Sequence, residues 1–406
     1  MKILYLHQYF KFPTENGGTR SYDLTKSFVK NDHEVTVIST SNDPQYKTKN
    51  RWESIITEGF TVKYIYLPYG NELSYIQRAL VFLKFLWFAT FKLLKEKPDV
   101  VLATSTPLTI GIPALFKKWI HKTPFIFEAR DVWPEAVIAI GAITNKWLQK
   151  LLYFLEKTIY KNASAIVPLS TDMKNSIETR YPKACKNKPI VVIENLSEIN
   201  RFATTHSFIN IEEKLGLKPR FSILYAGTFG RVNGMDYVIE LAKKTLKIDP
   251  EIIFILIGDG ALKKEIQSVA REKEVLHKNV FILDPITKDE LPFWYKSVNM
   301  GSSFVIPIKE LWANSANKFF DTLAAGKPIL INHPGWQKTT IEKDNLGYVL
   351  PEKLTQQAVQ DFCYYTTNYE LHATQQKNAY NKATTRYSLE IASKKYQKVL
   401  NLITNN

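Results

Sequence analysis

Short apolar runs alternate with amphipathic helical stretches along the first half of the chain. The runs lie at residues 2–6, 34–40, 99–104, 124–128, 165–169 and 189–194. Apolar runs of this length are typical of strands that are buried on both faces of a parallel sheet. Because helical patterns separate several of them, the sequence predicts a parallel sheet with helices on both faces.

The same alternation begins again in the second half, with runs at residues 221–226, 251–257, 279–284, 300–306 and 328–332. We therefore predict α/β architecture with two Rossmann-like, doubly wound domains, at residues 1–197 and 198–387. A last helical pattern, within residues 388–406, either caps the second domain or crosses back to the first. Ligands of such sheets bind beyond the carboxyl ends of the strands, so we expect the catalytic centre in a cleft between the domains.

Composition and charge narrow the class of protein. The chain has 406 residues, 45% of them hydrophobic, and its two cysteines, Cys185 and Cys363, lie far apart. No disulfide framework or thiolate metal site is therefore expected, and a cytoplasmic protein without a secretory signal is our expectation. The formal charge of +15, with its larger share up to Ser197, favours anionic surroundings such as lipid, nucleic acid or phosphorylated ligands.

The segment NSANKFFDTLAAGKPIL, residues 314–330, carries the most chemistry. It predicts a helix with Asn317, Lys318 and Asp321 in its first turns, followed by a Gly-Lys-Pro stop and an apolar strand. The spacing brings an ammonium and a carboxylate together near the positive end of the helix dipole. This arrangement suits a nucleotide diphosphate sugar, with pyrophosphate on the ammonium and ribose on the carboxylate. An ordinary surface ion pair is the alternative interpretation.

Glycine-rich turns follow predicted strands in both halves. GGT precedes a helix that starts near residue 20, AGTFGRVNG follows the run at 221–226, and GDG follows the run at 251–257, before a helix expected from residue 261. Such turns let backbone amides approach an anion, although glycines that serve only a tight turn are the alternative. The candidate donor-binding residues are Gly17, Gly18, Gly227, Arg231, Gly258 and Asp259, with Asn317, Lys318 and Asp321.

The segment EARDVWPE, residues 128–135, lies at the carboxyl end of a predicted strand. Arg130 and Asp131 interrupt an apolar run there, and Glu128 and Glu135 flank them. We interpret Arg130 and Asp131 as catalytic candidates and the two glutamates as acceptor-binding candidates, because this strand end points into the expected cleft. In the alternative interpretation, Arg130 and Asp131 form a structural salt bridge that holds the next loop.

Together, the segments HQYF, GGTRSYDL, FEARDVWPEA, YAGTFGR, IGDG and NSANKFFDTLAAGKP resemble the retaining GT-B-fold glycosyltransferases of family four. The resemblance covers nearly the whole chain and indicates a bacterial branch of amino-sugar (fucosamine) transferases in surface polysaccharide assembly. It implies transfer of a sugar with retained configuration from a nucleotide diphosphate donor, expected to be UDP-linked, to a lipid-linked or saccharide acceptor. The implied enzyme class is that of hexosyl or amino-sugar transferases (EC 2.4).

The resemblance also implies roles for individual residues. The C-terminal domain would bind the donor, with Asp321 in the place of a family glutamate that holds ribose, and Arg231 and Lys318 on the pyrophosphate. Ala313 stands where the family has a further glutamate, which departs from the family pattern for the donor hexose. Arg130 and Asp131 fall where related enzymes place a histidine near the reacting sugar. No cofactor and no metal are expected, because helix ends and cations stabilise the leaving diphosphate.

A strongly apolar helix is predicted over residues 76–94, interrupted by Arg78, Lys84 and Lys92. These charges make a membrane-spanning helix improbable and leave a broad apolar face. That face either packs on the sheet or lies in a membrane interface, which would place the protein peripherally on the inner face of the cytoplasmic membrane. Two other functions remain open: a nucleotide-sugar epimerase of the same fold, and a basic nucleic-acid-binding protein. The scattered basic residues match no nucleic-acid-binding motif, so no nucleic acid is expected.

Overall fold

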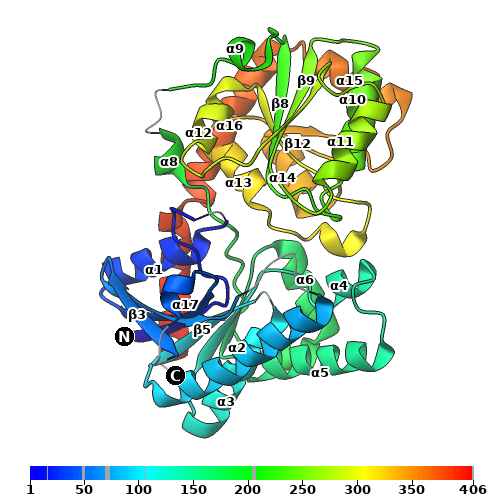
Figure 1. Ribbon diagram of the computed structural model, residues 1–406. Coiled ribbons are helices and arrows are strands. Elements are labelled where there is room, and N and C mark those ends of the chain that lie inside the picture. Colours follow the sequence, from blue (N-terminus) through cyan, green and yellow to red (C-terminus); the bar gives the residue numbers. More distant parts are fainter. Residues whose placement is uncertain (16, 48–50, 69–73, 106, 204–206, 405–406) are drawn as a thin grey trace. The chain divides into compact units, whose positions relative to one another are not determined.

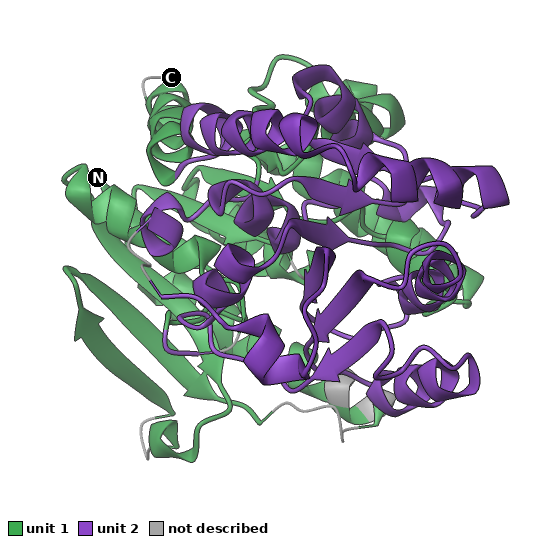
Figure 2. Ribbon diagram, turned by 90° about the horizontal axis from the view of Figure 1, so that it is seen from above, with its two compact units in different colours: residues 1–13, 17–194, 389–406 green, residues 14–16, 195–388 purple. Residues whose placement is uncertain are grey.

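The chain folds into two compact units (Figure 2). The structure is a computed structural model that describes residues 1–404 apart from 16, 48–50, 69–73, 106 and 204–206. Residues 1–13, 17–194 and 389–406 form the first unit, and residues 14–16 and 195–388 form the second. The C-terminal helix thus belongs to the first unit, which is one of the two alternatives that the sequence left open.

The first unit is built on a seven-stranded sheet with the order β3-β4-β2-β1-β5-β6-β7. All neighbours are parallel except β3 and β4, which form an antiparallel pair. The strands are β1 (Lys2–Leu6), β2 (Glu34–Ser41), β3 (Trp52–Thr57), β4 (Phe60–Tyr66), β5 (Val100–Thr104), β6 (Phe125–Ala129) and β7 (Ala165–Pro168).

Helices cover both faces of this sheet (Figure 1). Side chains of α2, α3 and α5 share one hydrophobic core with β1, β5 and β6. The C-terminal helix α17 packs against α1 through the rings of Tyr396 and Phe28 and a hydrogen bond from Asn31 to Ser393. The helices are α1 (Arg20–Lys30), α2 (Tyr75–Lys95), α3 (Gly111–His121), α4 (Glu135–Ala139), α5 (Lys146–Asn162), α6 (Thr171–Arg180), α7 (Pro182–Cys185) and α17 (Leu389–Thr404), with short 3-10 turns at Pro44–Tyr46 and Leu108–Ile110.

The second unit has a six-stranded parallel sheet in the order β10-β9-β8-β11-β12-β13. Its first strand lies next to the middle of the sheet, and the strand order reverses there, as in doubly wound folds. The strands are β8 (Phe221–Ala226), β9 (Ile252–Ile257), β10 (Val280–Leu283), β11 (Met300–Ser303), β12 (Ile329–Ile331) and β13 (Gly347–Val349). Two Rossmann-like α/β units confirm the predicted fold class.

Helices α10, α11 and α15 share one core with this sheet, and α13, α14 and α16 share another. The helices are α8 (Ile199–Ala203), α9 (Ile211–Leu215), α10 (Met235–Leu246), α11 (Lys263–Glu272), α12 (Leu291–Ser297), α13 (Asn317–Ala324), α14 (Trp336–Asp344), α15 (Gln356–Tyr365) and α16 (Tyr369–Arg386), with a 3-10 turn at Lys309–Leu311.

Two sequence predictions about elements need correction, and two features of the sheets were missed. The run at 189–194 follows β7 through three backbone hydrogen bonds, but it pairs with β7 at one bridge, between Ile190 and Ile166, and is not a regular strand. The carbonyls of Ile193 and Glu194, at its end, accept hydrogen bonds from Arg20. The hairpin of β3 and β4 and the strand β13 were not predicted. Helix α11 begins at Lys263 rather than at residue 261.

Candidate functional site

The turns after β8 and β9 lock together at the carboxyl edge of the second sheet. The amide of Gly227 donates to the carbonyl of Ile257 (2.9 Å), and the amide of Phe229 donates to the carbonyl of Asp259 (2.8 Å). A β-carbon on Gly258 would lie 1.9 Å from the carbonyl oxygen of Gly227, so glycine is required for this close approach. Gly258 is buried and therefore serves the turn, whereas Asp259 is exposed and accessible to a ligand.

Helix α13 begins at Asn317, and Lys318 lies in its first turn, as predicted. Its ammonium is 4.8 Å from the centre of the Tyr225 ring. A β-carbon on Gly227 would lie 2.5 Å from Cε and 2.8 Å from Nζ of Lys318, so the glycine leaves room for this side chain. The ammonium forms no ion pair with any carboxylate in the described residues, Asp321 included. The alternative of an ordinary surface ion pair between Lys318 and Asp321 is therefore wrong, and a cation beside a helix N-terminus favours an anionic ligand.

Replacing Gly227 with alanine tests the position of this ammonium. The new methyl group would push Lys318 off the Tyr225 ring, because it would stand 2.5 Å from Cε. We expect Gly227→Ala to weaken the binding of a nucleoside diphosphate by about tenfold, the loss of one charge-assisted contact, as measured by calorimetric titration. Gly216→Ala is the matched control, since Gly216 also has a positive φ (73°) but open space around its α-carbon. An equal loss of affinity in both variants would contradict the prediction.

Asp321 lies one turn further along α13 and is only 9% exposed. Burial, opposed by the ammonium of Lys288 and assisted by the carboxylate of Glu198, raises the pKa of Asp321 from 3.8 to about 7. Among the described residues, none forms a hydrogen bond or an ion pair with this carboxylate. An unpartnered buried carboxylate is unfavourable for folding, and such groups are found disproportionately where a ligand supplies the missing contacts.

A group of charges beside Asp321 escaped the sequence analysis. The carboxylate of Glu198 binds Lys288 and also accepts a hydrogen bond from Arg201 at 2.6 Å. Although burial favours its neutral form, these two cations hold the pKa of Glu198 below its usual range. Glu198 and Arg201 lie in a segment that reads as an interdomain connector, and their i,i+3 spacing is the one signal that suggests a pair.

The remaining predicted donor residues have different surroundings. Arg231 is exposed and lines a pocket of about 200 Å³ together with Gly230, Gly234 and Asn332, from the loops after β8 and β12. The side-chain carbonyl of Asn317, in contrast, accepts a hydrogen bond from Asn195. The structure therefore brings Lys318 to the turn that contains Gly227, and it gives Asn317 a partner within the protein.

In the first unit, Glu128 lies in the interior and has lost contact with solvent. Its carboxylate accepts hydrogen bonds from Arg20, from Thr104 and from Tyr396 of the C-terminal helix. Burial alone would raise its pKa, but chiefly the Arg20 guanidinium holds the pKa of Glu128 down to about 2. These contacts favour a structural role for Glu128, and they argue against the acceptor contact that we predicted.

Arg130 and Asp131 follow β6 and are both half-buried. The Arg130 amide donates to Ser105 at 2.9 Å, and its guanidinium lies 3.5 Å from Nε2 of His7. Burial first, and then the charge of Arg130, lower the pKa of His7 to about 3. His7 is therefore neutral and a very weak base at neutral pH.

The other predicted residues of the first unit are Glu135, Gly17 and Gly18. Glu135, predicted to bind the acceptor, pairs with Arg180 of α6 at 2.6 Å, an ion pair that the sequence did not predict. Gly17 is exposed with φ of +134°, and Gly18 follows it just before α1. The glycines thus retain the accessible backbone that an anion-binding turn needs.

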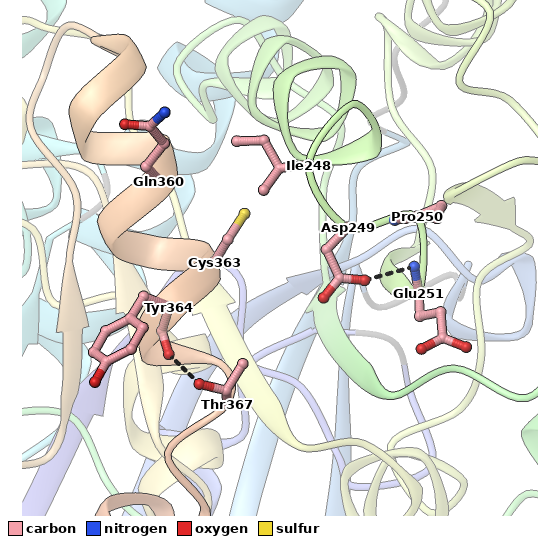
Figure 3. A pocket seen from close by; sticks show the side chains of 8 residues that line it. All are labelled: Ile248, Asp249, Pro250, Glu251, Gln360, Cys363, Tyr364 and Thr367. Carbon is pink, nitrogen blue, oxygen red and sulfur yellow. Dashed lines mark hydrogen bonds between the residues drawn. The ribbon is translucent and has the colours of Figure 1, made fainter.

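A larger depression, of about 600 Å³, lies at the opposite edge of the second sheet (Figure 3). It is lined by the loop before β9 and by α15, including Asp249, Cys363 and Tyr364. Because this is the amino edge of a parallel sheet, it is not where doubly wound folds bind their substrates.

In the described part of the chain, no group of three or more His, Cys, Asp or Glu side chains gathers in a way that could hold a metal ion. None of the described helices is both long enough and apolar enough to cross a membrane.

Comparisons with known proteins agree with this geometry. Residues 17–195 match the family described as Glycosyl transferase 4-like domain, and residues 207–382 match Glycosyl transferases group 1. The chain belongs to the group 1 glycosyltransferases with the GT-B fold. The two family matches fall on the two Rossmann-like units of this glycosyltransferase, one match on each unit.

Individual relatives of this glycosyltransferase are distant. It is 25% identical over 255 residues to the uncharacterized glycosyltransferase MJ1059 of Methanocaldococcus jannaschii, a match that covers 59% of this chain and 58% of the relative. It is 24% identical to the putative colanic acid biosynthesis glycosyl transferase WcaI of Escherichia coli K12, over 76% and 77% of the two chains. The structure of Alr3699/HepE from Anabaena in complex with UDP-glucose is similar over 100% of both chains, with a TM-score of 0.68 and 16% identity. At this identity the likeness shows the fold alone.

Proposed function

We propose that this glycosyltransferase transfers a sugar with retained configuration from a UDP-linked donor to a lipid-linked or saccharide acceptor during assembly of a cell-surface polysaccharide. One observation carries the proposal. At the start of α13, a cation without an ion-pair partner in the described residues and a buried carboxylate without a hydrogen bond stand at the carboxyl edge of a doubly wound sheet. These two groups match the two ends of a nucleoside diphosphate.

Each end of the nucleotide has a complementary group. The pyrophosphate binds the Lys318 ammonium and the first amides of α13, with Arg231 as a second cation. The ribose hydroxyls donate hydrogen bonds to the Asp321 carboxylate. The diphosphate leaves without a metal ion, because the helix end and the two cations stabilise the charge that develops on it.

The reacting sugar lies between the diphosphate and the acceptor, and Arg130 and Asp131 are proposed to contact it. The bond between the anomeric carbon and the phosphate oxygen breaks while the acceptor oxygen bonds to the same face of that carbon. The acceptor proton passes to the departing phosphate oxygen. This route needs no protein base, in keeping with the very low pKa of the nearby His7.

The donor sugar is proposed to be an amino or deoxyamino sugar, which rests on the resemblance of the chain to amino-sugar transferases. We propose that the protein acts in the cytoplasm, at the inner face of the membrane that carries the lipid-linked acceptor. The match to a relative described as a colanic acid biosynthesis enzyme supports the polysaccharide assignment.

Incubation with radiolabelled UDP-sugars, with and without a lipid-linked saccharide fraction, tests this function. We expect label to move into the lipid fraction only when both donor and acceptor are present. Appearance of an epimeric nucleotide sugar without an acceptor would contradict the proposal and favour the epimerase alternative. If no UDP-sugar serves as donor but another nucleotide sugar does, the assignment of UDP would be wrong, and the glycosyltransferase function would stand.

A further inference from the structure

Helix α5 exposes a stripe of large apolar side chains. Trp147 is 83% exposed, Leu151 60% and Phe154 67%, and their spacing puts all three on one side of the helix. The opposite side of the same helix packs Ile159 and Tyr160 into the core of the first unit. Helix α5 therefore has two apolar faces, and only one of them is used in folding.

Helix α2 also has both buried and exposed apolar side chains. On α2, Phe85 and Leu93 are buried, whereas Trp87 and Phe91 are exposed and contact each other. Core packing, one of the two alternatives left open for this helix, is thus confirmed at Phe85 and Leu93. Trp87 and Phe91 leave part of its apolar surface exposed, and its contact with a membrane stays a prediction. The side chains of Ile76 and Arg78, which entered that prediction, lie outside the described part.

Helix α3 joins the other two into one surface. Trp119 and Ile120 of α3 are exposed, and Trp119 donates a hydrogen bond to Asn162 at the end of α5. Close packing of α3 on α5 is enforced at Gly111, where a β-carbon would lie 2.5 Å from Ile159. Figure 1 shows α2, α3 and α5 side by side over the same sheet. We call their exposed side the α2–α3–α5 face.

Most charges of this face are positive, although Lys117 is buried and Lys92 pairs with Glu96, the residue after α2. The three helices contain nine lysines and one arginine, and their only acidic residue is Glu156. Glu156 is buried and bonded to Arg180 and Tyr181, so it does not offset the lysines at the surface. On α5, Lys150 and Lys157 are exposed beside the apolar stripe.

We propose that the α2–α3–α5 face docks on an anionic lipid membrane, with its aromatic side chains in the headgroup region and its lysines on lipid phosphates. Tryptophan and phenylalanine beside lysine, without exposed acids, is the composition of an interfacial surface. A second copy of this chain fits less well, because a symmetric contact would place lysines against lysines. The inference extends the proposed function, since docking would bring the enzyme to a lipid-linked acceptor, but it rests on this surface alone.

Co-sedimentation with vesicles tests the proposal. We expect the wild-type chain to pellet with vesicles of equal parts phosphatidylcholine and phosphatidylglycerol, and weakly with phosphatidylcholine alone. The variant Trp147→Ser/Leu151→Ser/Phe154→Ser should lower the partition coefficient by about a thousandfold, since each of the three large buried side chains is worth roughly a factor of ten. Lys150→Glu/Lys157→Glu should weaken binding to the anionic vesicles and leave the weak binding to neutral ones unchanged.

The matched control is Ile56→Ser/Tyr364→Ser, which removes side chains that are 81% and 79% exposed elsewhere on the chain. It should bind vesicles like the wild type. Unchanged vesicle binding by the α5 variant would overturn the proposal, and so would a lipid-independent dimer that the same variant dissociates in sedimentation velocity. Nucleotide affinity, measured alongside, separates the two assignments: vesicle binding that fails while nucleotide still binds removes the docking face and leaves the glycosyltransferase function intact.

Discussion

Asp321→Asn is expected to stabilise the protein while weakening its binding of nucleotide. Burial keeps the folded-state pKa of Asp321 near 7, well above its unfolded value of 3.8, so the folded state holds a proton that the unfolded state releases. Stability therefore falls as the pH rises from about 4 to 7, and the full penalty is present above that range. Asparagine has no charge to bury, and each kcal/mol recovered raises the thermal midpoint by about 2–4 °C.

Differential scanning calorimetry at pH 5 and pH 8 measures this gain, which should be larger at pH 8. Titration with UDP should show a loss of affinity of about tenfold to a hundredfold at pH 8, because ribose loses a charged acceptor. Wild-type affinity should also rise from pH 6 to pH 8 more steeply than that of the variant. Asp361→Asn, at an exposed carboxylate of α15, is the control and should change neither property. A lower midpoint together with unchanged UDP affinity would remove Asp321 from the site.

Glu128→Gln is expected to cause the largest loss of stability, about 3–5 kcal/mol, because it leaves the Arg20 guanidinium buried without a counter-charge. The same carboxylate holds Tyr396 of α17, so the variant also loosens the C-terminal helix. Urea unfolding followed by circular dichroism measures the change in the free energy of unfolding.

The double variant Arg20→Met/Glu128→Gln serves as the control, since it removes the orphaned charge along with the pair. It should be more stable than Glu128→Gln alone. The pH dependence gives an independent check: because the pKa of Glu128 is held down to about 2, its contribution is full above pH 4.5 and is lost as the pH falls toward 2. If the double variant lost the sum of the stability losses of Arg20→Met and Glu128→Gln, each measured alone, the two residues would not be a coupled pair.

The sequence predicted those parts of the fold that depend on local pattern. Strand β8 was located to the residue because its run is apolar except for Ser222, and the first turns of α13 were located because a polar segment precedes residues of helical spacing. The β3–β4 hairpin escaped because β3 alternates exposed and half-buried residues and lacks an apolar run. The segment 189–194 follows β7 through three backbone hydrogen bonds, as its strand-like composition suggests, without forming a regular strand. The hydrogen bond from Arg20 to the carbonyl of Glu194 escaped, because no local pattern reveals a contact over that distance in sequence.

In the candidate site, too, the sequence predicted groups that are close in the chain and missed groups that only folding brings together. Lys318 and Asp321 stand on one helix, so their spacing alone suggested a joint role. Glu198, Lys288 and Arg20 act through partners that are distant in the sequence, and only the folded chain brings them together. For α5, an apolar pattern cannot distinguish a core face from an exposed one, because both have the same helical period. Burial in the structure made that distinction.

Calorimetric titration of UDP into the wild-type chain and into the variant Lys318→Ala/Asp321→Ala tests most directly whether α13 holds the nucleotide. We expect UDP to bind the wild type and to bind the variant at least about a hundredfold more weakly, from the loss of one phosphate contact and one ribose contact. The variant should keep its cooperative unfolding transition, since neither side chain forms an ion pair within the described residues. Equal UDP affinity in the two proteins, or no UDP binding to the wild type, would rule out this nucleotide site.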